Sequence, residues 1–487
     1  MTQNIAIVGS GFLGMTLALR LAERGDHVTL FESASEIGGL ASAWQIGEVT
    51  WDKHYHVTLM SDANTRAIVE ELGLGDEFRW VETKTGFYTD GHLFSMSDTM
   101  EFLAFPPLGL IDKLRLGATI FYASRVKNWK RLEKITVEKW LTRLSGRRTF
   151  EKIWRPLLKA KLGDAYRETS AAFIWATIQR MYAARRSGMK KEMFGYVRGG
   201  YSRVLERFAE ILTEKGVEIR LNAAIENVEK LASGKFRVAT AAKRRRDDAK
   251  LRILPQKTKY AAFQAAATIA PGFSGAFLAE PDLKPSKVVP FSKNGFADTF
   301  DKVILTCPSN IAATLAPQLT REEKRDLESI RYQGIICASV LTRTSLSNFY
   351  VTNITDDAPF TGVIEMSAMV DKRELDGNAL IYLPKYVAPD DELFERTDDE
   401  IKEIFLHGLE KMSPLFRRED VIDLKVSRVR QVFPLPVLNY SRDLPGFQTS
   451  VDGLYVVNSS HIVNGTLNVN ETIALADAAF RELKMQN

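Results

Sequence analysis

The first thirty residues carry the most regular pattern of hydrophobic and polar positions in the chain. Residues 4–8 are an apolar run that predicts a strand buried on both faces, and residues 15–24 have the apolar spacing of a helix. Gly25 then ends the helix, and residues 27–31 predict a second buried strand. The pattern predicts a β-α-β unit of a parallel, doubly wound sheet, with Glu32 at the end of its second strand.

Glycines stand at the turn between the first strand and the helix. We expect Gly9 to allow the tight turn, Gly11 to let the backbone approach a pyrophosphate, and Gly14 to let the helix pack closely on the strand. The N-terminal N–H groups and the dipole of the predicted helix 15–24 would face the phosphates. We therefore interpret this stretch as a candidate dinucleotide-binding site. The alternative is a glycine-rich turn that binds no ligand.

The acid and a second glycine pair extend this site. The Glu32 carboxylate suits a ribose 2′-hydroxyl, and a glutamate rather than an arginine argues against a 2′-phosphate. Gly38 and Gly39, six residues later, resemble the extended fingerprint of FAD-binding oxidoreductases, which favours FAD over NAD. The expected cofactor contacts of this segment are Gly9, Gly11, Phe12, Leu13, Gly14, Glu32, Ser33, Gly38, Gly39, Leu40, Ala41 and Ser42.

Composition narrows the class of protein. A chain of 487 residues exceeds one typical domain, so two or more lobes are expected. Its only two cysteines, Cys307 and Cys337, lie in apolar stretches and exclude a disulfide framework. We predict no metal site. The first strand begins at residue 4, no run of about eighteen uncharged apolar residues occurs, and we expect a cytoplasmic protein.

The net charge of +5 is unevenly distributed. Between residues 112 and 161, fifteen Lys and Arg face only four Asp and Glu. Such a region can recruit an anionic substrate, an anionic membrane surface or nucleic acid, and equally can be a set of solvated helix faces. Residues 102–129 are also amphipathic, which suits peripheral contact with the inner face of a membrane, although core packing is the simpler interpretation of the apolar positions. We expect no nucleic-acid partner.

Several later motifs carry a family resemblance. The motif Asp52-x-x-Tyr55-His56, the stretch 84–91, the stretch 152–158 and the sequence Arg-Gly-Gly-Tyr at 198–201 resemble bacterial protoporphyrinogen-oxidase-like flavoproteins. These belong to the flavin amine oxidase and phytoene desaturase superfamily. The resemblance implies an α/β fold with a discontinuous, Rossmann-like FAD-binding domain (residues 1–75, 196–239, 299–319 and 446–487) and an inserted α+β substrate lobe (residues 76–195 and 320–445).

The resemblance also implies further cofactor contacts. Ile225 matches the residue that holds the adenine through its backbone, and Asn458 and Asn468 lie in the segments that match the strand and loop facing the flavin. The loop at residues 465–471, which contains Asn468, lacks an arginine that some relatives carry. Residues 240–298, with the basic run 243–246, depart from the relatives and are interpreted as a basic insertion. A solvated segment is the simpler reading, and docking to an acidic partner or lipid is the alternative.

The implied chemistry is hydride transfer to flavin N5 from a small-molecule substrate, anionic or linked to a lipid, isoprenoid or glycan. We expect Tyr55 and His56 beside the flavin ring, with His56 acting as a base, orienting the substrate, or only packing there. His54 and His56 would share one face if their stretch is a strand, but they make a weak metal site. Lys159 and Lys161 are candidates for binding an anionic substrate.

Two other functions remain open. One is a non-redox flavin isomerase resembling UDP-galactopyranose mutase, and the other is a non-catalytic flavin-binding scaffold whose basic regions bind a partner. No cysteine lies near the C-terminal flavin loop, so we expect the FAD to be non-covalent. The leading prediction is an FAD-dependent dehydrogenase, desaturase or oxidase.

Overall fold

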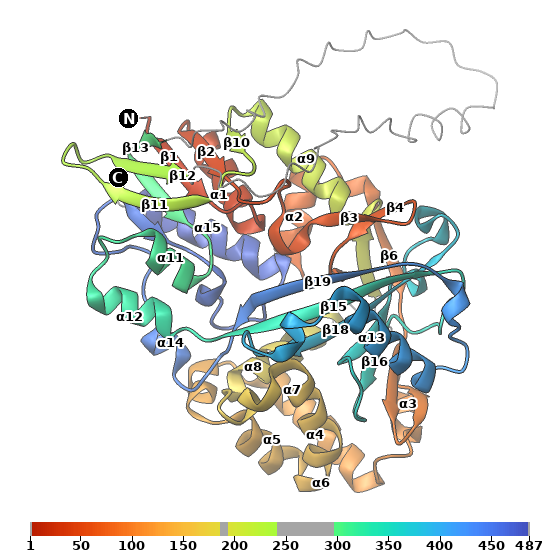
Figure 1. Ribbon diagram of the computed structural model, residues 1–487. Coiled ribbons are helices and arrows are strands. Elements are labelled where there is room, and N and C mark those ends of the chain that lie inside the picture. The colour runs from red at the N-terminus through yellow and green to blue at the C-terminus, as the bar shows by residue number, and fades with distance from the viewer. Residues whose placement is uncertain (1, 186–192, 241–296, 486–487) are drawn as a thin grey trace, which may run out of the picture.

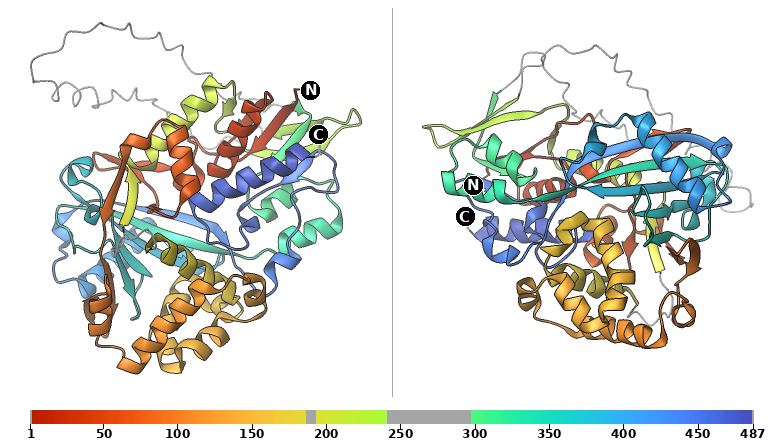
Figure 2. Two further views of the ribbon diagram at one scale, coloured as in Figure 1. Left: turned by 180° about the vertical axis from the view of Figure 1, so that it is seen from behind. Right: turned by 60° about the horizontal axis from the view of Figure 1, so that its bottom comes forward.

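The computed structural model describes residues 2–185, 193–240 and 297–485 (Figure 1). Its described part contains a five-stranded parallel sheet, a seven-stranded mixed sheet and a group of helices. The helices α4, α5 and α6 lie at the end of the molecule opposite the N-terminus, as Figures 1 and 2 both show. This arrangement confirms the predicted fold class, an α/β nucleotide-binding domain combined with an α+β lobe.

The five-stranded sheet is assembled from four distant segments of the chain. All of its strand pairs are parallel, and Ile7 in the middle lies opposite Leu30 on one side and Ile304 on the other. The strand order is β10 (Glu218–Arg220), β2 (His27–Phe31), β1 (Asn4–Val8), β14 (Lys302–Leu305) and β20 (Leu454–Val456). Each strand falls within a predicted segment of the FAD-binding domain, although the exact domain boundaries stay a prediction.

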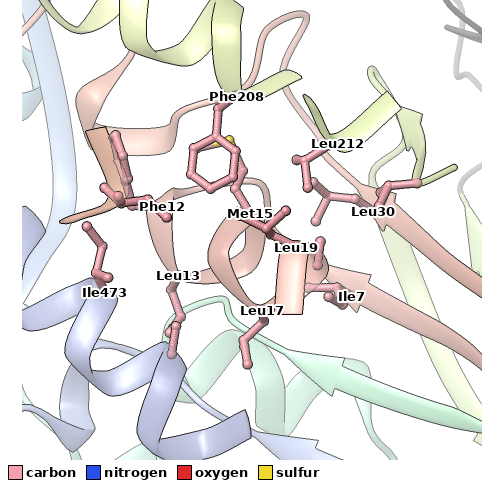
Figure 3. Packing of buried hydrophobic residues seen from close by; sticks show 14 of the residues in the cluster. Ile7, Phe12, Leu13, Met15, Leu17, Leu19, Leu30, Phe208, Leu212 and Ile473 are labelled. Atoms are coloured by element: carbon pink, nitrogen blue, oxygen red, sulfur yellow. The ribbon is translucent and has the colours of Figure 1, made fainter. Parts of the chain in front are cut away.

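Helix α1 (Phe12–Glu23) is apolar on most of its surface, so burial on several sides is the stable solution. It packs against α15 (Val469–Met485) and α9 (Gly200–Glu214), and α2 (Ala63–Glu71) packs against α15 and contacts α1 through the Arg20–Glu71 ion pair. Figure 3 shows this core, in which Phe12, Met15 and Leu19 face residues of α9 and β2, and Leu13 faces α15. The first helix of the chain is thereby held by one of the last.

The other face of the parallel sheet is covered by a three-stranded antiparallel sheet, β11 (Ile225–Lys230), β12 (Phe236–Thr240) and β13 (Ala297–Phe300), with α11 (Ser309–Leu315) and α12 (Arg321–Ser329) nearby. Ala239 pairs with Ala297. Thr240, Ala297 and Asp298 therefore belong to strands, so both edges predicted for the insertion at 240–298 lie in regular structure. The rest of that segment, with its basic run, lies outside the described residues.

The seven-stranded sheet forms the second lobe. Strand β15 (Tyr332–Thr342), which lies between β19 (Val421–Pro434) and β18 (Ala379–Val387), is buried along its whole length. The order is β19, β15, β18, β17 (Gly362–Glu365), β16 (Val351–Ile354), β7 (Thr85–Thr89) and β8 (His92–Ser95). A small sheet of β5 (Thr58–Leu59), β9 (Met193–Val197) and β6 (Phe78–Glu82) lies beside the hairpin of β3 (Ala43–Ile46) and β4 (Val49–Asp52).

One predicted helix in this lobe begins later than the pattern indicates. Residues 392–411 read as a single helix, but the chain makes a short 3-10 turn at Glu392–Glu395 and starts α13 (Asp398–Met412) afresh. Thr397 is the cause: its hydroxyl accepts the Glu400 N–H at 3.3 Å, while the Glu400 carboxylate accepts the Thr397 N–H at 2.8 Å. This reciprocal capping box fixes a helix start.

The third group is the helical part of the substrate lobe: α3 (Thr99–Ala104), α4 (Leu110–Arg125), α5 (Val137–Ser145), α6 (Arg147–Thr149), α7 (Arg155–Leu162) and α8 (Ala171–Arg185). A π-helical turn, Phe150–Trp154, joins α6 to α7. Trp140 and Trp154 lie in the core of this lobe, and Trp154 Nε1 donates to Ser145 Oγ at 3.0 Å. Trp140 and Trp154 are therefore core residues of the helical lobe.

Candidate functional site

Packing within the protein requires a glycine at two of the three glycine positions in the first turn, Gly9 and Gly14, but not at Gly11. Gly9 has a φ of 112°, and a Cβ there would lie 2.5 Å from Thr306 Oγ1; a Cβ on Gly14 would lie 1.9 Å from the Gly9 carbonyl oxygen. Gly11 has an ordinary φ of −67°, and its Cβ would meet no atom within 4 Å. Packing within the chain therefore does not explain Gly11, and an open approach to its backbone suits a bound phosphate.

The N-terminus of α1 begins at this open position. Gly11 is the N-cap and offers no side-chain hydrogen bond, and the first turn contains no acidic residue. The side chains of Phe12 and Leu13 are buried. The ring centroid of Phe12 lies 5.4 Å from that of Tyr201 and 6.1 Å from that of Phe208. Phe12 and Leu13 can thus contact a cofactor only through their backbone. Free N–H groups and the helix dipole favour an anion there.

The second glycine turn lies directly against the first. Gly38 and Gly39 have φ values of 108° and 57°, and the Gly38 N–H donates to the Ser10 carbonyl at 2.9 Å. A Cβ on Gly39 would lie 3.3 Å from Gly11 Cα, whereas one on Gly38 would collide with Leu205. The fold thus brings together two glycine turns that are more than twenty residues apart in sequence. Ala41 and Ser42 follow as buried residues.

Glu32 lies at the carboxyl end of β2, beside both turns. Its Oε2 accepts the Ser10 N–H at 3.0 Å and the Ser10 hydroxyl at 2.7 Å, and its Oε1 accepts the Ala34 N–H at 2.9 Å and the exposed Ser33 hydroxyl at 3.2 Å. The carboxylate also lines a cavity of 240 Å³ whose other walls include Gly39, Leu40, Ser42, Lys53, His54, Ser427 and Val429. Four predicted cofactor residues therefore share one cavity.

The remaining predicted cofactor residues come from three other segments. The Ala223 N–H donates to the Glu32 carbonyl at 2.7 Å, which places the start of β11, and with it Ile225, beside the end of β2. Asn458 is buried, and its amide donates to the Cys307 carbonyl at 2.9 Å. Asn468 Oδ1 accepts the Glu471 N–H at 3.1 Å at the start of α15. Both asparagine side chains hold loops in place, and their contact with a cofactor stays a prediction.

The loop after β4 carries the candidate catalytic residues, and it is not a strand. The predicted alternation of His54 and His56 on one strand face therefore does not occur. His54 Nε2 lies 3.2 Å from Ser427 Oγ at the cavity, and burial lowers its pKa to about 3, with His56 and Lys53 contributing. A neutral imidazole thus faces the cavity near neutral pH. Sequence reasoning did not assign His54 a place there.

His56 points to a different set of groups. Its ring centroid lies 5.0 Å from that of Tyr201, and its Nδ1 lies 3.6 Å from Asp52 Oδ2, just beyond hydrogen-bonding distance. The other Asp52 oxygen accepts the Tyr201 N–H at 2.8 Å, and the Asp52 carbonyl accepts the Tyr382 hydroxyl at 2.5 Å. Burial raises the pKa of the Asp52 carboxyl. Asp52 is thus a fixed, buried carboxyl group beside His56, a role that the sequence did not reveal.

Tyr55 belongs to an aromatic cluster that includes a lysine. Its hydroxyl lies 2.9 Å from that of Tyr386, and burial raises the pKa of Tyr55 to about 12. Lys161 Nζ lies 3.7 Å from the Tyr386 ring centroid and 5.1 Å from that of Phe433, and burial lowers its pKa to about 7. Lys159 is exposed. Of the two lysines proposed as anion ligands, Lys161 contacts the ring of Tyr386, whose hydroxyl is the partner of the candidate residue Tyr55.

Comparison with known proteins identifies related sequences and folds. The family described as flavin containing amine oxidoreductase matches residues 14–252 and 282–468. A zeta-carotene desaturase of Synechocystis sp. is 25% identical over 261 residues, covering 48% of this chain and 52% of that protein. The chain thus spans about half the length of this relative.

Two solved structures show the same fold. A putative protoporphyrinogen oxidase from Exiguobacterium sp. superposes with a TM-score of 0.70 at 16% identity, covering all of both chains. A reduced UDP-galactopyranose mutase superposes with a TM-score of 0.68 at 14% identity, covering 100% of this chain and 95% of the other. At such low identity these likenesses concern the fold alone.

Proposed function

Because the chain belongs to the flavin containing amine oxidoreductase family, we propose that it is an oxidoreductase that binds FAD non-covalently and dehydrogenates or desaturates a small molecule. The observation that carries the proposal is the open position at Gly11. It lies against Gly39 at the N-terminus of α1, where the packing of the protein itself gives no reason for a glycine. A dinucleotide whose pyrophosphate approaches this backbone supplies that reason.

The residues around this point fit the cofactor. The two glycine turns and the backbone of Phe12 and Leu13 would hold the pyrophosphate. The Glu32 carboxylate would hold a ribose hydroxyl, because the exposed Ser33 hydroxyl, its longest contact at 3.2 Å, can give up its place. Ile225 would meet the adenine. When bound, FAD supplies a hydride acceptor.

The chain's own candidate catalytic group is His56. A buried carboxyl group at Nδ1 orients the ring and favours the tautomer that carries its proton on Nδ1, so that Nε2 is free to accept a proton. The distance of 3.6 Å from Asp52 is compatible with this role, because such contacts are often long before substrate binds. We assign Asp52 as a positioning residue and Tyr55, through its hydroxyl contact with Tyr386, as a group that orients the substrate.

The similarity to a zeta-carotene desaturase supports dehydrogenation at a C–H bond, and the substrate that we propose is linked to a lipid, an isoprenoid or a glycan. The alternative is a non-redox isomerase related to UDP-galactopyranose mutase, whose structure shares the fold. A flavin-binding scaffold without turnover is the third possibility. All three need the same cofactor site, so flavin content supports the site and a separate measurement must identify the reaction.

The test has two stages. The purified protein should be yellow and should release intact FAD on denaturation; a colourless protein that does not take up FAD contradicts the proposal. Oxidised holoenzyme is then mixed, without oxygen, with candidate lipid-, isoprenoid- and glycan-linked substrates while the flavin absorbance is followed. Bleaching by a substrate supports the oxidoreductase. Conversion of substrate only after dithionite reduction supports the isomerase, and neither response to any substrate supports the scaffold.

A further inference from the structure

Helix α4 has two apolar faces, and the structure covers only one of them. Leu116 and Ala123 are buried in the core of the helical lobe, on the inner side of the helix. On the outer side Leu110, Ile111 and Leu114 are exposed, with 73% of Ile111 and 62% of Leu114 accessible to solvent. A helix that is apolar on nearly all sides is normally covered on all sides. The outer face of α4 therefore lacks the covering that apolar helix faces normally have, and a binding partner could supply it.

The exposed apolar side chains are concentrated in this part of the molecule. Among the described residues, seven of the thirteen large apolar side chains that are exposed lie between positions 100 and 122. On α4 they continue to Phe121 and Tyr122, and on the neighbouring α3 they include Met100 and Leu103. We call these exposed residues of α3 and α4 the α3–α4 surface. Such a concentration marks an interaction site rather than ordinary surface variation.

Positive charge borders this apolar surface. Arg115 and Arg125 are exposed on α4, and Arg125 lies 4.8 Å from the Phe121 ring centroid. Arg148, at the start of α6, lies 3.6 Å from Asp112 at the first turn of α4, so that the bases of α6 are beside the surface. After α4, four further bases are exposed: Lys127, Lys130, Arg131 and Lys134.

The acidic groups nearest the surface are few. Asp112 is engaged by Arg148, and the buried Glu133 accepts the Ser441 hydroxyl and N–H. On α3, Asp98 caps the helix and Glu101 accepts from Ser95 and Ser97. The carboxylates therefore bind groups of the protein itself, and the exposed bases are left to act on a partner.

We propose that the α3–α4 surface docks reversibly on an anionic lipid bilayer. The exposed leucine, isoleucine, methionine and phenylalanine side chains would enter the boundary between headgroups and acyl chains, while the neighbouring lysines and arginines contact the anionic headgroups. Tyr122, exposed, and Trp129, half-buried, suit the same boundary because each has an apolar ring and a polar atom. Among the described residues, no helix is long and apolar enough to cross a membrane.

The charge distribution favours lipid over a protein partner. Apolar side chains in the centre of a contact can serve either partner, but a border in which exposed bases outnumber the acids, and in which those acids bind groups of the protein itself, fits a surface of uniform negative charge. The end of the molecule that carries α4 and α6 lies opposite the five-stranded sheet and the N-terminus (Figures 1 and 2), so a planar membrane would meet this end without contacting that sheet.

Vesicle flotation tests the proposal. The full chain is mixed with phosphatidylcholine vesicles containing 30% phosphatidylglycerol, or with phosphatidylcholine alone, at about 50 and 500 mM NaCl. We expect flotation with the anionic vesicles at low salt, release at high salt, and at least tenfold weaker binding to neutral vesicles, because the attraction of bases to the surface decays within a Debye length.

Paired variants separate the apolar and the charged contributions. Ile111→Ser with Leu114→Ser, and Lys127→Glu with Lys130→Glu and Arg131→Glu, should each reduce binding to anionic vesicles on the order of tenfold or more. Their matched controls change exposed residues elsewhere in the molecule: Ile404→Ser with Leu415→Ser, and Arg321→Glu with Lys372→Glu and Lys411→Glu. Each control makes the same change in hydropathy or net charge as the variant with which it is paired. The controls should bind anionic vesicles as the wild type does.

Three results would overturn the proposal. The first is no flotation with anionic vesicles at low salt, and the second is an equal loss in the variants and their controls. The third is a wild-type protein that is oligomeric without vesicles and becomes monomeric through Ile111→Ser with Leu114→Ser, which would make the surface an interface between copies of this chain. Because all substituted side chains are exposed, melting curves by circular dichroism should stay within a few degrees of the wild type.

Discussion

Replacing Gly11 with alanine isolates the reason for a glycine at the first turn. The residue has a φ of −67° and a ψ of 174°, which any amino acid adopts, and an added Cβ meets no atom within 4 Å. In the protein without cofactor, Gly11→Ala should therefore change the free energy of unfolding by no more than about 1 kcal/mol, because the lower entropy of the unfolded chain is offset by the poorer fit of alanine to the N-cap position of α1. Gly14→Ala, with its Cβ 1.9 Å from the Gly9 carbonyl oxygen, should instead disrupt the turn.

With FAD the expectation reverses. If the pyrophosphate approaches the Gly11 backbone, a methyl group there occupies the contact surface, and overpacking of a fitted contact costs about 1–3 kcal/mol. At 1.4 kcal/mol for each factor of ten, the dissociation constant for FAD should rise roughly 5- to 150-fold. The variant should thus combine a stable apoprotein with weak flavin binding, a combination that general destabilisation does not produce.

The assay titrates apoprotein with FAD by flavin fluorescence and measures unfolding by denaturant in parallel. Gly117→Ala is the matched control: Gly117 lies inside α4, also has no atom within 4 Å of its Cβ position, and is remote from the glycine turns. It should stabilise by about 1 kcal/mol and leave FAD affinity unchanged. If Gly11→Ala binds FAD as tightly as the wild type, the pyrophosphate does not approach this residue and our reasoning about the turn is refuted.

Three further predictions concern other residues. Glu32→Ala should weaken FAD binding by about 1–3 kcal/mol, the range for hydrogen bonds to a charged group, and should also lower the melting temperature because the Ser10 N–H loses its acceptor; unchanged affinity in a titration removes Glu32 from the ribose role. His56→Ala should slow flavin reduction by a substrate on the order of 10²–10⁴-fold with normal FAD content, whereas loss of FAD itself would indicate that the ring only packs there. Burial lowers the pKa of Lys161 from 10.5 to about 7, so between these values the unfolded state binds more protons and stability rises with pH. Lys161→Met should remove that rise and stabilise the protein most below pH 7. The free energy of unfolding, measured with denaturant at several pH values from 6 to 10, would contradict this prediction if it varied with pH in the same way in the variant and in the wild type.

Local patterns were sufficient to predict the nucleotide-binding unit. The strand at Asn4–Val8, the helix after Gly11, the strand at His27–Phe31 and the turn at Gly38 follow one another within forty residues, and each has its own periodicity or glycine requirement. The capping box of Thr397 and Glu400 was readable in the sequence, so the late start of α13 was predictable and was missed.

The candidate catalytic contacts could not be predicted in the same way. His54 meets Ser427, which is 373 positions away, and Lys161 meets rings from β18 and β19. Such contacts depend on how the second sheet packs on the helices, and no periodicity within one element encodes that packing. The two histidines would have shared one face only if their stretch were a strand, and this condition is not met: the chain after Asp52 leaves the hairpin as a loop, so the two rings contact different partners.

The burial of α1 against α15 has a consequence for protein synthesis. The first glycine turn is synthesised more than 440 residues before Val469, the first residue of the helix α15 that forms one wall of the core around α1. At about 5–20 residues per second, roughly 20 to 90 seconds separate the two events. Throughout that interval the apolar surface of α1 lacks this cover and needs protection from aggregation. A flavin cofactor can therefore meet a finished site only after α15 has left the ribosome.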